Sequence, residues 1–198
     1  TVVAPMGYGK TTAVEWYLAE RAGAEAPYIV RISVYSGNLA IFWKSVQDAF
    51  TRAGFAFLRE YDCPTDGASG GLLIDDLCHS LTGEKSCYIF IDDFHLLTDK
   101  RAPGFLCALA GRLPPNVHLI LASRDLFLPA AELVRLGGKV YQIGTAQLRL
   151  NHTELAVYTN RCGTALSDEQ IDTLLYYSEG WFSAVYLNLR MFSEHGVL

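Results

Sequence analysis

The chain has 198 residues, of which 51% are hydrophobic and 19% are charged. This apolar content can fill a hydrophobic core and excludes a disordered chain. The 16 Lys and Arg against 21 Asp and Glu leave a net charge of −5, which argues against binding nucleic acid by phosphate neutralisation and against binding an anionic membrane surface. No apolar run reaches the roughly 18 to 20 residues that a membrane span needs, so we expect no membrane partner.

The cysteines and the first residues bear on where the protein works. The five cysteines are an odd number of well-separated thiols. This pattern predicts neither a disulfide framework nor a zinc site and indicates the reducing cytoplasm. The chain opens with Thr1-Val2-Val3 rather than with a methionine, so we expect it to be a piece of a longer protein.

Apolar runs alternate with amphipathic stretches along residues 1–147. The predicted strands are Val2–Ala4, Tyr28–Val34, Cys87–Ile91, Val117–Ala122 and Lys139–Ile143. The helices predicted between them are Lys10–Ala22, Leu39–Ala53, Leu72–Leu81 and Pro103–Leu113. The segment Arg59–Gly71 is rich in glycine and predicts a mobile loop. Alternation of helices with nearly continuous apolar strands favours an α/β fold with a five-stranded, mostly parallel sheet flanked by helices.

The pattern changes after residue 147, where no further strand is predicted. Capping boxes at Asn151–Glu154 and Ser167–Gln170 each predict the start of a helix, and Gly180 is suited to end the second one. A third helix is predicted over Trp181–Ser193. We therefore expect a nucleotide-binding domain over residues 1–147 and a small helical subdomain over residues 148–198.

The segment between the first strand and the first helix carries the strongest motif, A-P-M-G-Y-G-K-T-T at Ala4–Thr12. It matches the phosphate-binding pattern G-x-x-x-x-G-K-[ST], with Ala4 in place of the first glycine. Gly7 and Gly9 let the backbone turn its N–H groups toward phosphate oxygens, and the helix N-terminus adds its positive dipole. Lys10 is expected to bind the β- and γ-phosphates of ATP or ADP. The predicted nucleotide contacts are Pro5, Met6, Gly7, Tyr8, Gly9, Lys10, Thr11 and Thr12.

A phosphate loop needs a carboxylate that holds Mg²⁺ at the end of a neighbouring strand. The apolar run Cys87–Ile91 ends in Asp92 and Asp93. Asp92 and the Thr11 hydroxyl are expected to hold Mg²⁺, and Asp93 is expected to face the attacking water and the γ-phosphate. A helix N-cap is the alternative interpretation of Asp93.

Another buried strand is predicted just before Arg124. The carboxyl ends of parallel strands share one edge of a sheet, so Arg124 should lie at the same edge as the two acids. A guanidinium there can sense the γ-phosphate, and we take Lys10, Asp93 and Arg124 as the catalytic set. The alternative is an ordinary ion pair between Arg124 and Asp125 or Asp93.

The remaining candidates favour structural roles. The histidines show no metal-ligand spacing, and His95, close after the acids, is interpreted as a packing residue. Trp181, Phe182 and Tyr186 are interpreted as an apolar core between the two subdomains.

Three of these motifs together resemble the nucleotide-binding domain of MalT-like regulators, large LuxR-family transcription activators within the STAND class of P-loop ATPases. The likeness spans nearly the whole chain in the same order, and it rests on Ala4–Thr12, Tyr88–Leu97, Leu119–Arg124, Tyr141–Thr145, Leu148–Glu154 and Glu179–Leu187. The D-D-F-H-L and G-W-x-x-A segments are more specific than the phosphate loop alone.

The resemblance implies a fold and a regulatory role. The strand that leads to Arg124 would lie between the strands of the Walker A and Walker B motifs, and the helical part would close over the nucleotide. Such proteins self-associate when they hold ATP and rest when they hold ADP, and they bind DNA through a C-terminal domain that this chain does not include. Many STAND proteins carry a proline near adenine in a G-L-P-L-A segment, whereas residues 180–184 read G-W-F-S-A.

The sequence therefore predicts a slow regulatory ATPase module of a transcription regulator. A small-molecule kinase is a second possibility, although a kinase would want an arginine-rich lid over the phosphates, and only Arg149, Arg161 and Arg190 follow the predicted sheet. A third possibility is a signalling scaffold that uses nucleotide only for folding.

Overall fold

The structure is a computed structural model that describes residues 1–195. Its internal contacts form two compact units. Unit 1 comprises residues 1–3 and 11–142, and unit 2 comprises residues 4–10 together with the chain from residue 143 onward. The predicted domains 1–147 and 148–198 stay a prediction, because a grouping by contacts does not test which part folds independently.

Unit 1 is built on a sheet of four parallel strands. The strands are β1 (Val2–Val3), β2 (Tyr28–Ser33), β3 (Cys87–Asp92) and β4 (Val117–Ser123), in the order β1-β4-β3-β2. The first five residues of β3 are all buried, which explains why this strand is an unbroken apolar run: it has neighbours on both sides and helices over both faces. The prediction of a parallel α/β sheet is confirmed.

The predicted fifth strand, Lys139–Ile143, is wrong. Lys139 closes the short 3-10 turn η3 (Gly137–Lys139), and Tyr141 is 75% exposed. The strand with which this segment could pair in unit 1 is β1, and β1 has just two residues, Val2 and Val3. Beside β1, the amino group of Thr1 donates a hydrogen bond to the carbonyl of Tyr141 at 2.6 Å.

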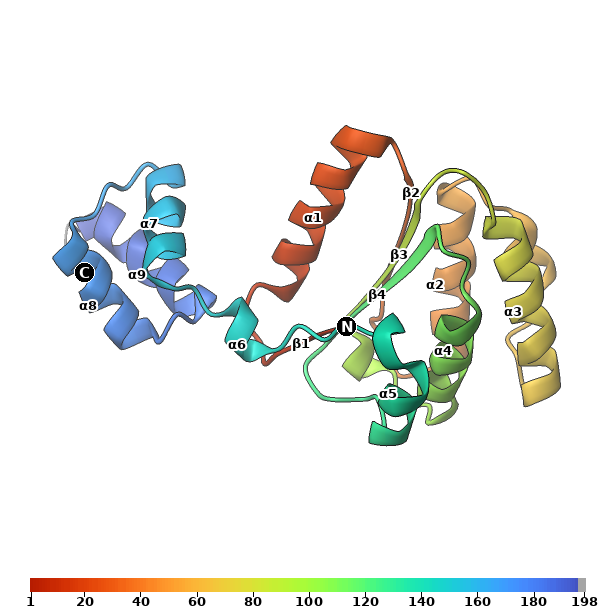
Figure 1. Ribbon diagram of the computed structural model, residues 1–198. Coiled ribbons are helices and arrows are strands. Elements are labelled where there is room, and N and C mark those ends of the chain that lie inside the picture. Colours follow the sequence, from red (N-terminus) through yellow and green to blue (C-terminus); the bar gives the residue numbers. More distant parts are fainter. Residues whose placement is uncertain (196–198) are drawn as a thin grey trace. The chain divides into compact units, whose positions relative to one another are not determined.

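Helices cover both faces of the sheet in unit 1. In Figure 1, α1 lies on one face and α2, α3 and α4 lie on the other. The bounds are α1 (Lys10–Glu25), α2 (Leu39–Arg52), α3 (Gly67–Leu81), α4 (Arg101–Arg112) and α5 (Ala130–Leu136), with 3-10 turns η1 (Phe57–Glu60) and η2 (Phe94–Leu96). The main core lies between the sheet and the α2–α4 layer, where Val30, Phe50, Leu73 and Ile89 are at most 2% exposed.

The interpretation of Arg59–Gly71 as a loop holds only for its middle. Residues 59 and 60 belong to η1, and α3 already begins at Gly67. The start is fixed by Asp66, whose side chain accepts a hydrogen bond from the N–H of Ser69 at 2.8 Å and forms a capping box with it. A good cap and a buried apolar face outweigh the low helix propensity of the glycines that follow.

Unit 2 contains α6 (Thr145–Leu148), α7 (His152–Arg161), α8 (Asp168–Ser178) and α9 (Phe182–His195). Both predicted capping boxes are confirmed: the N–H of Glu154 donates to Asn151, and the N–H of Gln170 donates to Ser167. The apolar core of α7, α8 and α9 is formed by Leu155, Ile171, Leu174, Val185 and Leu189. Among the residues described, no helix is long and apolar enough to cross a membrane.

Candidate nucleotide-binding site

The carboxyl ends of β1, β3 and β4 lie together at one edge of the sheet. Val3 pairs with Ser123, and Ile91 pairs with Leu121, so Asp92 and Arg124 leave the sheet at the edge where β1 ends. The strand β4 lies between β1 and β3. This order confirms what the resemblance implies for the strand that leads to Arg124, and crevices at such an edge are where open parallel sheets bind ligands.

Asp92 is held by two hydrogen bonds within unit 1. Its Oδ2 accepts from the Thr11 hydroxyl at 2.8 Å, and its Oδ1 accepts from the backbone N–H of Asp93 at 2.9 Å. Thr11 and Asp92 come from positions 81 residues apart, and they present hydroxyl and carboxylate oxygens side by side. This oxygen donor set suits Mg²⁺, which takes one or two protein oxygens and completes its shell with phosphates and water.

Asp93 adopts a left-handed backbone conformation, with φ 54° and ψ 37°. Non-glycine residues rarely adopt it, and such strain gathers at functional sites. Asp93 precedes the 3-10 turn η2, but its side chain makes no capping hydrogen bond. Asp93 therefore occupies the N-cap position of η2 without a side-chain capping bond, and its carboxylate, 47% exposed, stays accessible.

His95 lies beside this second acid. Its Nδ1 is 3.9 Å from Oδ1 of Asp93, and its side chain is 10% exposed. Neither ring nitrogen has a hydrogen-bond partner among residues 1–195. The burial agrees with the predicted packing role, and the position also brings an imidazole against the carboxylate that we expect to face the γ-phosphate.

Arg124 is exposed directly after β4. In the part of the chain that the structure describes, its guanidinium makes no hydrogen bond or ion pair. The neighbouring polar groups are paired without it, because the Ser123 hydroxyl donates to the Asp125 carbonyl at 2.8 Å. The structure thus gives no support to the interpretation of Arg124 as an ordinary ion-pair residue.

The phosphate loop belongs to unit 2 and has the backbone that the motif predicts. Gly7 and Gly9 have φ values of 83° and 71°, which residues with a side chain rarely adopt. The ammonium of Lys10 donates to the carbonyls of Ala4 at 2.7 Å and Pro5 at 2.9 Å, and the residue is only 8% exposed. Lys10 therefore lies inside the turn of the loop, where the pattern needs its charge.

The start of α9 holds the loop from outside, which sequence reasoning missed. The indole N–H of Trp181 donates to the Met6 carbonyl at 3.2 Å, and the backbone N–H of Ser183 donates to the Gly7 carbonyl at 3.0 Å. A Cβ on Gly7 would lie 2.5 Å from the Ser183 hydroxyl, so glycine is required there by contact as well as by conformation.

The predicted core of these aromatic residues between the two subdomains stays a prediction, and the contacts described here lie within unit 2. Trp181 is 38% and Tyr186 49% exposed. Phe182 packs against Tyr158 within unit 2, with ring centroids 5.2 Å apart, and a Cβ added to Gly9 would lie in van der Waals range of its ring. An indole needs a partner for its N–H, which is the one sequence signal that pointed away from a purely apolar role.

Replacing Trp181 by phenylalanine tests this support of the loop. The variant keeps an aromatic ring and loses the hydrogen bond to Met6, which is worth about 0.5–1.5 kcal/mol. We expect ATP and ADP to bind about 3- to 10-fold more weakly in calorimetric titrations, because the loop is less well fixed. Trp16→Phe on α1, at a position 59% exposed, is the matched control and should leave both affinities unchanged. Equal affinities in Trp181→Phe and the unmodified chain would contradict the assignment.

Comparison with known proteins adds to this geometry. No family model matches the chain. It is 21% identical over 203 residues to the HTH-type transcriptional regulator MalT of Vibrio campbellii and 24% identical over 185 residues to MalT of Yersinia pestis. Both alignments cover 92% of this chain and 20% of the relative. The resemblance to MalT-like regulators is confirmed. The chain spans about a fifth of the length of these MalT proteins.

Solved structures match the fold. Cdc6p from Pyrobaculum aerophilum superposes with a TM-score of 0.57 at 14% identity, covering 99% of this chain and 56% of that one. The Aeropyrum pernix ORC1 protein, determined in complex with DNA, gives a TM-score of 0.55 at 14% identity, covering 98% of this chain and 53% of that one. At this identity the likeness shows the fold alone, and it confirms the α/β fold with a parallel sheet flanked by helices, with four strands rather than five.

Proposed function

We propose that the chain is the ATP- and ADP-binding switch of a MalT-like transcription regulator. The observation that carries the proposal is the Thr11–Asp92 hydrogen bond at the edge where β1, β3 and β4 end. A threonine that directly follows the loop lysine and bonds the acid that ends β3 is the arrangement that Mg-nucleotide binding requires. The left-handed Asp93 next to it adds a second, strained carboxylate.

The residues divide into binding and metal-holding groups. Residues 5–12 would surround the phosphates with backbone N–H groups and with the Lys10 ammonium. Thr11 and Asp92 would hold Mg²⁺, which when bound neutralises charge on the phosphate oxygens. The Lys10 ammonium donates to the carbonyls of Ala4 and Pro5, so a bound phosphate would share or compete for its N–H groups with the loop backbone.

Hydrolysis is assigned to the two remaining polar residues at this edge. Asp93 would accept a proton from the attacking water, and Arg124, which has no ion-pair partner among residues 1–195, would stabilise charge on the γ-phosphate. Neither group is needed to bind ADP. The two residues therefore suit a slow ATPase in which the presence of the γ-phosphate is what the protein senses.

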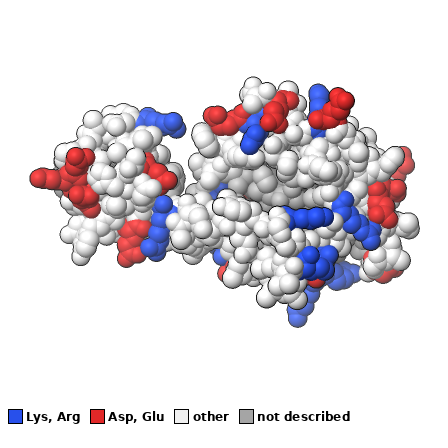
Figure 2. All heavy atoms as spheres, viewed as in Figure 1, with Lys and Arg blue, Asp and Glu red and all other residues white. Residues whose placement is uncertain are grey.

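The regulatory consequence rests on the similarity to MalT. We place the protein in the cytoplasm, with the ATP state favouring self-association and the ADP state a resting form. DNA would be bound by a C-terminal domain outside this chain. The net charge of −5 supports that assignment, and in Figure 2 uncharged atoms take most of the visible surface.

Arg124→Ala and Asp93→Asn test the switch. A ligand shifts a two-state equilibrium only by its differential affinity for the states, so a γ-phosphate sensor must separate ATP from ADP. Arg124→Ala should weaken ATP binding more than ADP binding, by about 1.5–3 kcal/mol for a lost charged hydrogen bond. Asp93→Asn should leave both affinities nearly intact and slow single-turnover hydrolysis.

The control for the arginine is Arg52→Ala, which removes the same charge from an exposed site at the end of α2. It should change neither affinity. An equal loss of ATP and ADP affinity in Arg124→Ala would remove the sensor role, and an unchanged hydrolysis rate in Asp93→Asn would remove the role as a base.

A further inference from the structure

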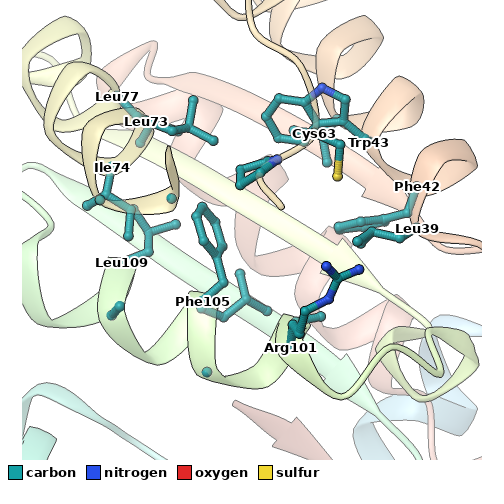
Figure 3. A pocket seen from close by; sticks show the side chains of 18 of the residues that line it. Leu39, Phe42, Trp43, Cys63, Leu73, Ile74, Leu77, Arg101, Phe105 and Leu109 are labelled. Carbon is teal, nitrogen blue, oxygen red and sulfur yellow. The ribbon is translucent and has the colours of Figure 1, made fainter. Parts of the chain in front are cut away.

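A cavity of about 380 Å³ lies within unit 1, away from the edge described above. Its floor is the sheet, with Ile32, Ile89, Ile91 and Leu119, and its walls are α2, α3 and α4. Figure 3 shows Phe105 and Arg101 of α4 rising toward Trp43 of α2 and toward Cys63, which precedes α3. The volume falls in the range of about 300–1,000 Å³ that is usual for small-molecule sites.

The cavity opens to solvent near Thr65 and Asp66 and reaches into the main core. Leu73 and Ile74 of α3 and Ile89 of β3 line it, and each is at most 2% exposed. Protein cores are normally packed with few voids larger than a water molecule, and an unfilled apolar cavity destabilises a fold in proportion to its volume. The deep part of this cavity, lined by buried apolar side chains, is therefore a surface that an apolar occupant would cover with a gain in stability.

The charged groups around the cavity are already paired. Arg101 donates to both carboxylate oxygens of Asp99, at 3.0 and 2.8 Å, and to the carbonyl of Thr65. Its side-chain hydrogen bonds lower the pKa of Asp99 to about 2, so this pair is ionised at every pH of interest. Arg112 is paired with Asp75 at 2.9 Å.

The acidic residue that lines the cavity is also held by hydrogen bonds. Asp66 caps α3, and the hydrogen bond from the Ser69 backbone lowers its pKa. Both arginines are paired with carboxylates, and Asp66 is ionised. The charged residues around the cavity therefore carry no excess positive charge that would attract an anion. The Cys63 thiol also stays neutral, because partial burial raises its pKa.

We propose that this cavity binds an uncharged, predominantly apolar small molecule. The floor and walls supply dispersion and hydrophobic contacts, and the aromatic rings of Phe42, Trp43 and Phe105 give flat surfaces for an aromatic or aliphatic body. The residues Cys63–Gly67 line the cavity together with the three helices, and its volume of about 380 Å³ fits a small molecule rather than a helix of a partner protein.

Two dyes with the same ring system test the proposal on the unmodified chain. N-phenyl-1-naphthylamine is neutral, and 8-anilino-1-naphthalenesulfonate carries one negative charge. The neutral dye should show saturable fluorescence enhancement with one site per chain and bind at least 10-fold more tightly than the sulfonate. Equal or tighter binding of the sulfonate, or enhancement that does not saturate, would overturn the proposal.

Matched glycine variants locate the bound dye. Gly71 lies in α3 and lines the cavity, whereas Gly23 lies in α1 and does not; a Cβ at either position meets nothing within 4 Å. Gly71→Leu should weaken binding of the neutral dye at least 10-fold, and Gly23→Leu should change it less than twofold. Both replace a helical glycine by a better helix former. Equal dye affinity in the two variants would place the dye elsewhere.

Thiol alkylation gives a measurement that needs no variant. Cys63 lines the cavity, and Cys162, which is exposed after α7, serves as the internal reference. Saturating N-phenyl-1-naphthylamine should slow iodoacetamide labelling of Cys63 at least fivefold and leave labelling of Cys162 unchanged, as read by peptide mass spectrometry. Unchanged labelling of Cys63 would contradict the proposal even if Gly71→Leu failed to fold.

Discussion

Replacing Lys10 by alanine is expected to weaken binding of both ATP and ADP by at least about 100-fold. Removing one partner of a buried charge pair costs about 3–5 kcal/mol, because the other charge is left uncompensated. The Lys10 ammonium is buried inside the loop, and it also holds the carbonyls of Ala4 and Pro5. The variant therefore loses the charge that would meet the phosphates and the two hydrogen bonds that join Lys10 to the backbone of the loop. Isothermal titration with each nucleotide in the presence of Mg²⁺ measures the effect.

Lys139→Ala is the matched control for this charge. It removes one positive charge and one lysine–carbonyl hydrogen bond, from Lys139 to Gly111 at 3.0 Å, without touching the phosphate loop. Its nucleotide affinities should stay within twofold of those of the unmodified chain. A Lys10→Ala protein that is folded by circular dichroism and binds ATP as tightly as the control would refute the phosphate-loop assignment.

Replacing Gly180 by alanine is expected to lower the free energy of unfolding by about 3 kcal/mol or more. The residue has φ 71°, and a left-handed conformation costs a residue with a side chain about 1–2 kcal/mol. An added Cβ would also lie 2.5 Å from the carbonyl oxygen of Leu150 and 3.1 Å from its nitrogen, which donates a hydrogen bond to the Gly180 carbonyl. The contact is with backbone, so it cannot be relieved by rotating a side chain, and overpacking adds about 1–3 kcal/mol.

Gly163→Ala separates the two contributions. Gly163 has φ 77°, and a Cβ there meets nothing within 4 Å, so this variant carries the backbone strain without the clash. Urea unfolding should show a loss of about 1–2 kcal/mol for Gly163→Ala and a clearly larger loss for Gly180→Ala. Equal losses in the two variants would mean that the approach of Leu150 to Gly180 does not matter.

Much of the fold was predictable because single physical signals dominate locally. The strand β3 reads as an unbroken apolar run since it is buried along its length. The helices α7 and α8 were located by their capping boxes, in which two side chains satisfy backbone N–H groups that a helix would otherwise leave unpaired. The conformation of the loop that ends at Lys10 was predictable because Gly7 and Gly9 have positive φ values, which glycine adopts far more readily than other residues.

The errors arose where distant partners decide the outcome. The apolar residues near Tyr141 looked like a strand, but the ladder available to them in unit 1 is only two residues long. The glycines at the start of α3 looked like a loop, and the cap at Asp66 with the packing of the rest of the helix made them helical. The bonds from Trp181 and Ser183 to the phosphate loop join positions about 175 residues apart in the chain, and no local pattern encodes them.

The central claim is Mg-dependent nucleotide binding at the edge that holds Thr11 and Asp92, and calorimetric titration of ATP into the unmodified chain tests it most directly. The titration is run once with Mg²⁺ and once with excess EDTA. We predict saturable binding at one site per chain that is at least 10-fold tighter with Mg²⁺, since Thr11 and Asp92 then share the ion with the phosphates. An absence of binding with Mg²⁺, or the same affinity in EDTA, would contradict the account.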